Sequence, residues 1–376
     1  MTSCLWLVCT LVATIGSIYA LLASFLVARF ARQPKSLSNA AEDVTLLKPL
    51  YGAEPGLSAS LASFCDQDYP ADLQMLCGVQ DPADKAIPAV RGLRRGRACD
   101  VELVVAPRTT DGNPKIGNIL NVFPRAKYDV IILSDSDIRV GPNYVRGIVA
   151  QLQQPRVGLV TCLYRGSALT GFWSRMAAAA VDQHFLPSVL VGVAFGLAKP
   201  CFGSTIALRR DTLERIGGFA AFANTLADDY AMGDAVRRLG LKVAIAPFTV
   251  GHTFAEDTFG ALLAHELRWA RTIRLVDPIG YVGSIVTHPL PFALAALPLS
   301  GFSAIAWMIL LVTLACRLCV PIQVERLAGG GKSSWWLSPL RDLLSFAVFV
   351  ASFVPGAVNW RGRRYSVGSD GTVTPI

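Results

Sequence analysis

The chain has 376 residues, of which 52% are hydrophobic and 16% are charged, and its mean hydropathy is +0.44. This composition is too apolar for an ordinary soluble protein, and the length suffices for a globular domain together with membrane segments. The net charge of +8 comes from residues spread along the chain, with no basic stripe interleaved with aromatic side chains. We therefore expect attraction to anionic lipids and no nucleic-acid partner.

Apolar residues gather first near the N-terminus. Residues 5–27 contain no charged side chain, and a helix needs about 20 residues to cross a bilayer. A cleaved signal peptide is the alternative, but no basic residue precedes the stretch and it is longer than the apolar core of most signals. We interpret residues 1–28 as a retained anchor. Arg29, Arg32 and Lys35 follow it, so the positive-inside rule places the next domain in the cytosol.

Further apolar stretches lie near the C-terminus, at residues 291–320 and 344–358. The first fits one tilted helix with a re-entrant lead-in, or two segments that meet near residues 298–301. One crossing would place Arg326 and Lys332 outside and the arginines at residues 361–364 in the cytosol, and two crossings would reverse both assignments. Charge therefore leaves the number of crossings open. We expect a C-terminal membrane region of two or three segments at residues 281–360, before a polar tail at residues 361–376.

Between these regions, short apolar runs alternate with polar or amphipathic segments, as in strand–helix units on a mostly parallel sheet. This α/β domain is predicted at residues 44–280, after a linker at residues 29–43. Strands are expected at residues 44–47, 73–79, 101–105, 130–133, 157–162 and 204–208, and helices at residues 57–64, 88–95 and 211–216. Residues 185–198 are apolar and too short to span a bilayer, which predicts a buried or an interfacial helix.

Two carboxylates follow the apolar run at residues 130–133. Asp135 and Asp137 would emerge together at the C-terminal end of a buried strand, where open α/β sheets bind their ligands. Two carboxylates two residues apart suit a hard divalent cation that bridges the oxygens of a diphosphate. A solvated turn is the alternative, because Asp and Ser are common turn residues. The position after a buried strand favours a nucleotide-sugar site.

Other polar residues flank neighbouring elements. Asp81 follows the second strand and could accept hydrogen bonds from a uracil ring or a ribose, or form an ordinary turn before Pro82. Lys115 opens a helix-like stretch and could offer a point charge to a diphosphate, or be a solvated lysine. Asp228 and Asp229 precede another helix, where one of them could cap the helix or act as a general base for an acceptor hydroxyl.

The segment His265-Glu266-Leu267-Arg268-Trp269 is amphipathic and leads toward the C-terminal apolar region. It begins like the His-Glu motif of a metalloprotease, but Trp269 stands where that motif needs a second histidine, which excludes the zinc interpretation. Arg268 beside Trp269 indicates a phosphate contact next to an aromatic wall. A membrane-interface belt is the alternative, since Trp and Arg are also common there.

Taken in this order, these elements resemble the inverting GT-A glycosyltransferases of family 2 and family 21 type, and within them the ceramide glucosyltransferase group. The matching motifs are Leu46-Leu47-Lys48-Pro49-Leu50, Val79-Gln80-Asp81, Asn113-Pro114-Lys115, Asp135-Ser136-Asp137-Ile138-Arg139-Val140, Ala227-Asp228-Asp229-Tyr230 and Arg268-Trp269. The resemblance covers roughly residues 44–274. It implies a cytosolic GT-A domain, a UDP-sugar donor, and Mg or Mn as the divalent cation.

The resemblance also implies a role for each site residue. These roles are nucleoside contact for Asp81, ribose and metal contact for Asp135 and Asp137, general base for Asp229, and diphosphate or acceptor contact for Arg268 and Trp269. His184 lies where the group also carries a histidine, which implies a place at the acceptor entry. A satisfied interfacial histidine is the alternative.

Two features depart from the ceramide enzymes. His265 stands where they carry Gln or Arg, and the full Asp135-Ser136-Asp137 stands where they have a shortened motif. The segments at residues 162–166, 182–192 and 265–272 are more similar to the bacterial hopanoid-biosynthesis glycosyltransferases. That group is associated with adding N-acetylglucosamine to bacteriohopanetetrol.

We therefore expect a membrane-bound hexosyltransferase that uses a UDP-sugar, with a hopanoid as lipid acceptor and ceramide with UDP-glucose as the alternative. The resemblance implies a multi-pass protein of the inner (cytoplasmic) membrane. A membrane carrier with a degenerate cytosolic domain is the alternative from another class. Against it, the apolar stretches contain no obvious acid or base of the kind that marks a transport pathway.

Overall fold

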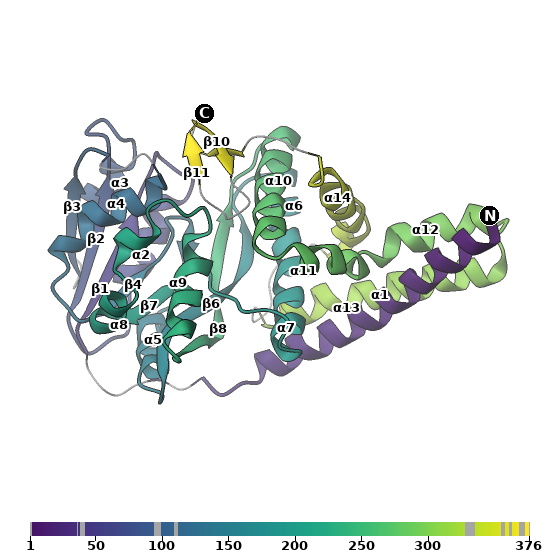
Figure 1. Cartoon of the computed structure of the whole chain (residues 1–376), viewed down its shortest axis with the longest axis horizontal. Coiled ribbons are helices and arrows are strands. Elements are labelled where there is room, and N and C mark those ends of the chain that lie inside the picture. The colour runs from purple at the N-terminus through teal and green to yellow at the C-terminus, as the bar shows by residue number, and fades with distance from the viewer. Residues whose placement is uncertain are drawn as a thin grey trace. The chain divides into compact units, whose positions relative to one another are not determined.

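The structure, a computed structural model, describes residues 2–35, 37, 42–93, 99–108, 112–327, 335–354, 358–360, 363–367 and 373–375. The chain divides into two compact units, whose elements are labelled in Figure 1. The helical unit comprises Met1–Gln33, Thr170–Ala198 and Phe254–Gly356, and the sheet unit comprises Pro34–Leu169, Lys199–Thr253 and Ala357–Ile376. Parts of the predicted linker and tail, and the end of the helix predicted at residues 88–95, lie outside the described residues.

An eight-stranded sheet forms the sheet unit. Its strands are β1 (Val44–Pro49), β2 (Leu73–Val79), β3 (Asp100–Val105), β4 (Val130–Leu133), β5 (Ile138–Arg139), β6 (Val157–Ala168), β7 (Ile206–Arg209) and β8 (Lys242–Phe254). Their order is β3-β2-β1-β4-β7-β6-β8-β5, and the first four are parallel. The predicted α/β class is confirmed.

The expectation of a mostly parallel sheet is wrong for the second half. Strand β7 is antiparallel to both β4 and β6, and β5 is antiparallel to β8. A short apolar run has the same residue pattern whichever way the strand points, so the sequence pattern carried no information on direction. A small antiparallel sheet, β11-β10-β9, follows at the C-terminus, with β9 (Val358–Trp360), β10 (Arg363–Val367) and β11 (Val373–Pro375).

Helices pack against this sheet. They are α2 (Leu57–Cys65), α3 (Ile87–Leu93), α4 (Pro114–Val122), α5 (Tyr144–Leu152), α8 (Arg210–Arg215) and α9 (Asp228–Arg238). One buried apolar cluster joins the strands to α4 and α9, through side chains such as Leu133 of β4, Ile116 of α4 and Met232 of α9. Burial of these aliphatic side chains places the starts of α4 and α9 beside the end of β4.

The described residues of the helical unit are mostly helical. The helices are α1 (Thr2–Ala31), α6 (Phe172–Ala180), η2 (Val181–Phe185), α7 (Leu186–Ala194), α10 (Phe259–Val276), α11 (Pro278–Gly283), η4 (Ser284–Thr287), α12 (Pro289–Leu299), α13 (Ala304–Leu327), η5 (Trp335–Leu337) and α14 (Ser338–Ala351). Helices α1, α12 and α13 lie side by side (Figure 1). Between α1 and α13 the hydroxyls of Ser17 and Thr313 are 3.0 Å apart in a buried contact, a common form of polar contact between membrane helices.

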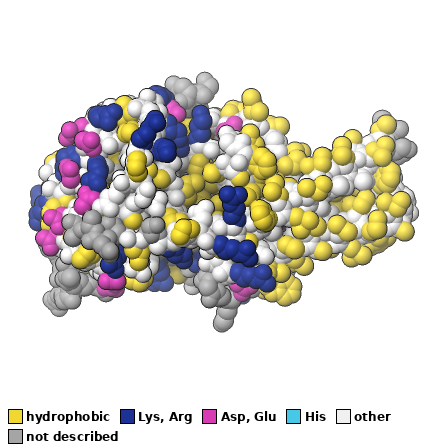
Figure 2. All heavy atoms as spheres, turned by 90° about the horizontal axis from the view of Figure 1, so that it is seen from below, with side chains coloured by type: hydrophobic (Ala, Val, Ile, Leu, Met, Phe, Trp, Pro, Cys, Tyr) yellow, Lys and Arg dark blue, Asp and Glu magenta, His cyan; other side chains and the backbone are white. Residues whose placement is uncertain are grey.

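Within the described part of the chain, three helices are long and apolar enough to cross a membrane: Cys4–Ala31, Phe172–Ala194 and Ala304–Leu327. Helix pair Pro278–Thr287 and Pro289–Leu299 also qualifies, although it is bent by 58°. Hydrophobic side chains cover the exposed face of the α1, α12 and α13 bundle (Figure 2). The helical break between α12 and α13 falls beside the junction predicted near residues 298–301.

The stretch at residues 185–198 belongs to a longer helix than the sequence predicted. A π-helical turn joins α6 to α7, so that the continuous helix runs for 23 residues. The small side chains of α6, four of them alanine, continue the helix without adding charge after Arg175. The expectation that this stretch is too short to span is therefore wrong, because the apolar run was counted without the alanine-rich turns before it.

Candidate active site

A buried lysine fixes the loop that follows β4. Lys48 Nζ donates hydrogen bonds to Ser134 Oγ at 3.2 Å and to the Asp135 carbonyl oxygen at 2.6 Å. It also lies 3.7 Å from the centroid of the Phe64 ring, a cation–π contact. Burial lowers the pKa of Lys48 to about 8, and the negative charges of Asp135 and Asp137 oppose the shift. The main chain of the Asp-Ser-Asp motif is thus held by the end of the first strand.

Lys115 connects this loop to the start of α9. Asn113 caps α4, since its Oδ1 accepts from the backbone N–H groups of Lys115 and Ile116 at 2.9 and 3.2 Å. Lys115 Nζ then lies 2.8 Å from Asp135 Oδ1 and 3.3 Å from Asp228 Oδ2. Burial would lower the pKa of Lys115, but the two carboxylates outweigh it and raise that pKa above its usual value. The side chain is buried, so the solvated-lysine alternative is wrong.

Asp228 and Asp229 occupy the first turn of α9, and the N-cap position is an alanine. Asp229 Oδ2 accepts a hydrogen bond from the Gly203 backbone N–H at 2.8 Å, and its Oδ1 accepts from the Tyr230 N–H at 2.8 Å. Burial raises the pKa of Asp229 to about 6, the charge of Asp228 adds to the shift, and Lys115 opposes it. A carboxyl group with such a pKa is suited to take a proton near neutral pH.

Gly203 allows the cluster to close. Its carbonyl oxygen accepts from the Asp135 N–H at 3.1 Å. A β-carbon at this position would lie 2.5 Å from Asp135 Oδ2 and 2.9 Å from the Lys115 ammonium, closer than real contacts allow. A side chain here would force the Asp135 carboxylate and the Lys115 ammonium to move, so glycine preserves their observed positions. Gly203 was not predicted as a site residue, because the close approach involves segments far apart in the chain.

His252 lies beside the second carboxylate of the motif. Its Nε2 is 3.0 Å from Asp137 Oδ2, and β8 holds it opposite Ile138 of β5. The Thr253 N–H and hydroxyl donate to the Asp137 carbonyl oxygen at 2.9 and 2.8 Å. The Asp137 side chain is 34% exposed. His252 was not predicted as a site residue, although a histidine within an alternating polar and apolar run indicates a strand position that could reach a site.

Carboxylate oxygen and imidazole nitrogen are both metal ligands, and oxygen donors suit Mg²⁺ and Mn²⁺. Asp137 with His252 therefore fits a divalent cation, whereas Asp135 is turned toward Lys115. Among the residues that the structure describes, no group of three or more His, Cys, Asp or Glu side chains is arranged to hold a metal.

Asp81 follows β2 and is exposed. Its Oδ1 accepts from the Ala83 N–H at 2.8 Å, and its carbonyl oxygen accepts from the Asp84 N–H at 3.0 Å. The turn that the sequence offered as the alternative is therefore present. A role in nucleoside binding stays a prediction for this residue.

The Arg268-Trp269 pair lies on α10 in the helical unit. The Trp269 ring meets the His265 ring edge to face at 4.6 Å and the Phe254 ring at 6.2 Å. His265 Nδ1 lies 2.6 Å from Glu256 Oε1, which fixes the imidazole. Trp269 thus packs in an aromatic cluster next to Arg268 in the sequence, and a phosphate contact by this pair stays a prediction.

A buried ion pair attaches the same helix to α14. Arg341 is fully buried and donates two hydrogen bonds to the Glu266 carboxylate, at 2.7 and 2.8 Å. This bidentate pair fixes the rotation of α10, which carries Arg268 and Trp269. This pair was not predicted from the sequence, since the two residues are 75 positions apart.

His184 lies in the π-helical turn and belongs to a second buried polar cluster. Its Nε2 is 2.9 Å from Asp342 Oδ1 and 3.2 Å from Arg317 Nη2, and its ring stacks on His288 at 5.4 Å. Arg317 lies inside the membrane-span candidate α13. The expectation that the apolar stretches contain no obvious acid or base is therefore wrong. A single arginine changes the overall hydropathy of a long apolar run very little, so it did not stand out.

The sequence model of glycosyl transferase family 21 matches residues 8–373. Ceramide glucosyltransferase 3 of Caenorhabditis elegans is 23% identical over 356 residues, which cover 88% of this chain and 74% of that protein. An N-acetylglucosaminyltransferase of Sinorhizobium fredii is 23% identical over 255 residues, covering 64% of this chain and 60% of that protein.

Among solved structures, a mannosyltransferase from Pyrobaculum calidifontis in complex with GDP-Man and Mn2+ is similar at a TM-score of 0.50 and 18% identity. The match covers 93% of this chain and 98% of that one. At this identity the likeness concerns the fold, and it agrees with the α/β sheet described above.

Proposed function

The chain belongs to glycosyl transferase family 21 and is a glycosyltransferase, and from that premise we propose that it transfers a sugar from a UDP-sugar to a hydroxyl group of a neutral membrane lipid. In this reaction the bond between the anomeric carbon and the diphosphate oxygen breaks. A new bond forms from that carbon to the acceptor oxygen. The acceptor proton goes to a base, and UDP leaves.

The observation that carries the proposal is the environment of Asp229. Its carboxylate is held by the Gly203 N–H within a cluster that contains Lys115, Asp135 and Asp228. We assign Asp229 as the base that takes the proton from the acceptor hydroxyl, because burial and the charge of Asp228 raise its pKa to about 6. Asp228, bonded to Asn113 and Lys115, maintains the cluster instead.

Asp137, with His252 beside it, would hold a divalent cation, Mg²⁺ or Mn²⁺, and Asp135 would contact the ribose. A cation there supplies positive charge to the diphosphate as it leaves. Lys115 keeps Asp135 in place by direct ion pairing. Its positive charge is already balanced by two carboxylates, so it would attract a nearby diphosphate less than an unpaired lysine would. In this proposal Asp81 contacts the nucleoside, and Arg268 with Trp269 contacts the diphosphate or the acceptor.

For the acceptor we propose a hopanoid such as bacteriohopanetetrol, with N-acetylglucosamine as the transferred sugar. The support is the sequence likeness at residues 162–166, 182–192 and 265–272, together with the similarity to bacterial N-acetylglucosaminyltransferases. Ceramide with UDP-glucose is the second candidate, because a ceramide glucosyltransferase matches 88% of the chain.

We further propose that the protein is a multi-pass protein of the cytoplasmic membrane with its sheet unit in the cytosol. The support is the three candidate spans and the basic residues Arg29 and Arg32 at the end of α1.

The test uses the full-length protein in lipid nanodiscs. UDP-N-acetylglucosamine and UDP-glucose are each offered with bacteriohopanetetrol and with ceramide, and the lipid products are identified by mass spectrometry. We expect N-acetylglucosaminyl-hopanoid as the main product, absent in the Asp229→Asn variant. Glucosylceramide as the main product would establish the second candidate. Donor turnover with no glycosylated lipid in any of the four reactions would refute the proposed acceptor class.

A further inference from the structure

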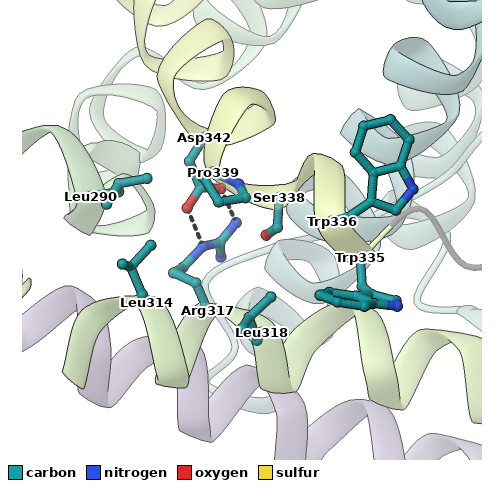
Figure 3. Close-up of a pocket in the computed structure, with 9 residues that line it drawn as sticks. All are labelled: Leu290, Leu314, Arg317, Leu318, Trp335, Trp336, Ser338, Pro339 and Asp342. Atoms are coloured by element: carbon teal, nitrogen blue, oxygen red, sulfur yellow. Dashed lines mark hydrogen bonds and ion pairs between the residues drawn. The ribbon is translucent and has the colours of Figure 1, made fainter. Parts of the chain in front are cut away.

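The helical unit contains a pocket between α12, α13 and the start of α14 (Figure 3). Its volume is about 260 Å³. The apolar wall consists of Leu290, Leu314 and Leu318 with the indoles of Trp335 and Trp336. The two indoles are 50% and 55% exposed. Half-exposed indoles beside apolar helices are typical of the membrane interface, where they place an apolar ring and a polar N–H at one depth.

A buried ion pair forms the floor of this pocket. Arg317 is 3% exposed and Asp342 is fully buried. The guanidinium donates two hydrogen bonds to the carboxylate, one of them from Nε at 2.7 Å, and a third to the Gln183 carbonyl oxygen at 3.3 Å. Arg317 lies on the candidate span α13, where an ionisable side chain is costly, and its partner Asp342 lies on α14. Because the two charges cancel, the floor offers no net charge to a ligand.

One polar group at the pocket still needs a partner. Ser338 is 1% exposed, and its hydroxyl has no hydrogen-bond partner among the residues that the structure describes. In Figure 3 the hydroxyl oxygen points toward the side of the pocket that holds Arg317 and Leu318. A buried hydroxyl is almost always hydrogen-bonded, so the position calls for a bound molecule that supplies a donor or an acceptor.

We propose that this pocket binds a neutral membrane lipid that carries a hydroxyl or amide group. The apolar part of the lipid lies against the leucines and the two indoles, and its polar group bonds to the Ser338 hydroxyl. The inference rests on the proposed function, for which it identifies a site for the acceptor. An anionic headgroup is disfavoured because the guanidinium of Arg317 is already paired with Asp342.

The volume supports part of a lipid as the occupant. Pockets for drug-sized molecules measure roughly 300–1,000 Å³, so 260 Å³ takes a chain segment or one or two rings and excludes a whole nucleotide sugar. The remainder of the lipid lies outside, along the exposed indoles. A polycyclic lipid and a two-chain amide lipid both satisfy this chemistry.

Two substitutions test the pocket. Leu314→Trp fills it, and Leu311→Trp is the matched control, because Leu311 is on the same helix and 64% exposed. Ser338→Ala removes the hydroxyl with little change in volume, and Ser338→Thr restores it. The melting temperature of each variant in detergent and its hydrolysis of UDP-sugar report folding independently of the lipid.

The experiment incorporates the full-length protein into nanodiscs that contain a diazirine-bearing ceramide or, in parallel, a diazirine-bearing phosphatidylglycerol. After irradiation, labelled peptides are mapped by mass spectrometry. We expect ceramide to label the peptides that contain Leu314 and Ser338, with about tenfold less label in Leu314→Trp and unchanged label in Leu311→Trp. Ser338→Ala should weaken labelling about threefold, the effect of one hydrogen bond, and Ser338→Thr should recover it.

The outcomes separate this inference from the proposed function. Ceramide labelling that is equal in Leu314→Trp and the wild type, or phosphatidylglycerol labelling as strong as ceramide labelling, would overturn the lipid site. Labelling as expected without transfer of sugar to any lipid would support the site and refute the proposed function. Transfer by the wild type that survives in Leu314→Trp would refute the site and leave the function standing.

Discussion

The ammonium nitrogen of Lys115 lies 2.8 Å from one carboxylate oxygen of Asp135. This contact gives the two carboxylates of the Asp-Ser-Asp motif different neighbours, because Asp135 is paired with a lysine while Asp137 lies beside His252. Burial raises the pKa of Asp135, and Lys115 opposes that shift. The two aspartates therefore have different charge environments although they are two residues apart.

Removing Lys115 should destabilise the sheet unit. Lys115→Met leaves Asp135 and Asp228 without their shared cation, and breaking a buried ion pair on one side costs about 3–5 kcal/mol. We expect the low end, about 3 kcal/mol, because the Asp135 side chain is 37% exposed.

The matched control is Lys127→Met, since Lys127 pairs with Asp100 and both side chains are more than half exposed. That change should cost at most about 1 kcal/mol. Denaturant unfolding of the detergent-solubilised protein, followed by tryptophan fluorescence, measures both changes. Equal stability of the two variants would contradict the assigned role of Lys115.

The second prediction concerns Asp229 and pH. A general base must be deprotonated to accept the acceptor proton, so kcat should fall as the pH drops through about 6, the pKa of Asp229. Asp229→Asn should lower kcat by about 10²- to 10⁴-fold while donor binding stays close to that of the wild type. Because Lys115 lowers the pKa of Asp229, any folded Lys115→Met variant should lose kcat at a higher pH than the wild type as the pH is lowered.

The control is the neighbouring residue. Asp228→Asn keeps the hydrogen bond from Asn113 and should reduce kcat less than Asp229→Asn. Initial rates measured from pH 5 to 9 distinguish the two variants. If Asp228→Asn abolished kcat and Asp229→Asn reduced it only slightly, the base would be Asp228 and the assignment would be wrong by one residue.

The third prediction is a divalent-cation requirement that Asp137 carries. Asp137→Ala should abolish transfer and Mn²⁺ binding in the presence of UDP, as measured by calorimetry. The fold should remain, because the side chain is 34% exposed and the carbonyl oxygen keeps its bonds to Thr253. The loss of the His252 contact should cost only about 1 kcal/mol.

Asp68→Ala is the control, as Asp68 is a 72% exposed carboxylate paired with Arg146. Its cation binding and turnover should equal those of the wild type. Full turnover of the wild type in EDTA, restored by no added metal, would count decisively against the requirement.

Elements defined by local sequence pattern were predicted, whereas elements defined by pairing between distant segments were not. The strands at residues 73–79 and 130–133 were predicted with their observed bounds, because each is an apolar run set between polar residues. Strand β8 was missed, since Lys242, Thr249, Gly251 and His252 dilute its apolar pattern. Its identity as a strand comes from pairing with β5 and β6, which local pattern does not encode.

The site shows the same division. Asp135, Asp137, Lys115 and Asp229 were found because their neighbours in sequence mark strand ends and helix starts. The partners Gly203 and His252 and the pairs of the helical unit were not found, because each is defined by a contact between distant segments. The Asp137–His252 contact, for example, joins residues 115 positions apart.

The last prediction is that the lipid acceptor approaches along the apolar surface around α7. Each buried methylene of a lipid is worth about 0.8 kcal/mol, so leaving the membrane requires protein contact to replace much of that burial. The structure shows which side chains can supply it. Phe195 and Leu197 are 61% and 76% exposed, whereas Val191 is 9% exposed on the helix that packs along α1.

Leu197→Asp should therefore impair transfer to the lipid at least tenfold while slow hydrolysis of the UDP-sugar continues, because the charge repels the lipid without touching the core. Val191→Asp should instead unfold the helical unit, since it buries an unpaired charge. Limited proteolysis, donor hydrolysis and lipid transfer are measured on both variants in nanodiscs. Normal lipid transfer by Leu197→Asp would exclude this surface as the route, and a protease-resistant, hydrolysing Val191→Asp would show that α7 is interfacial on both faces.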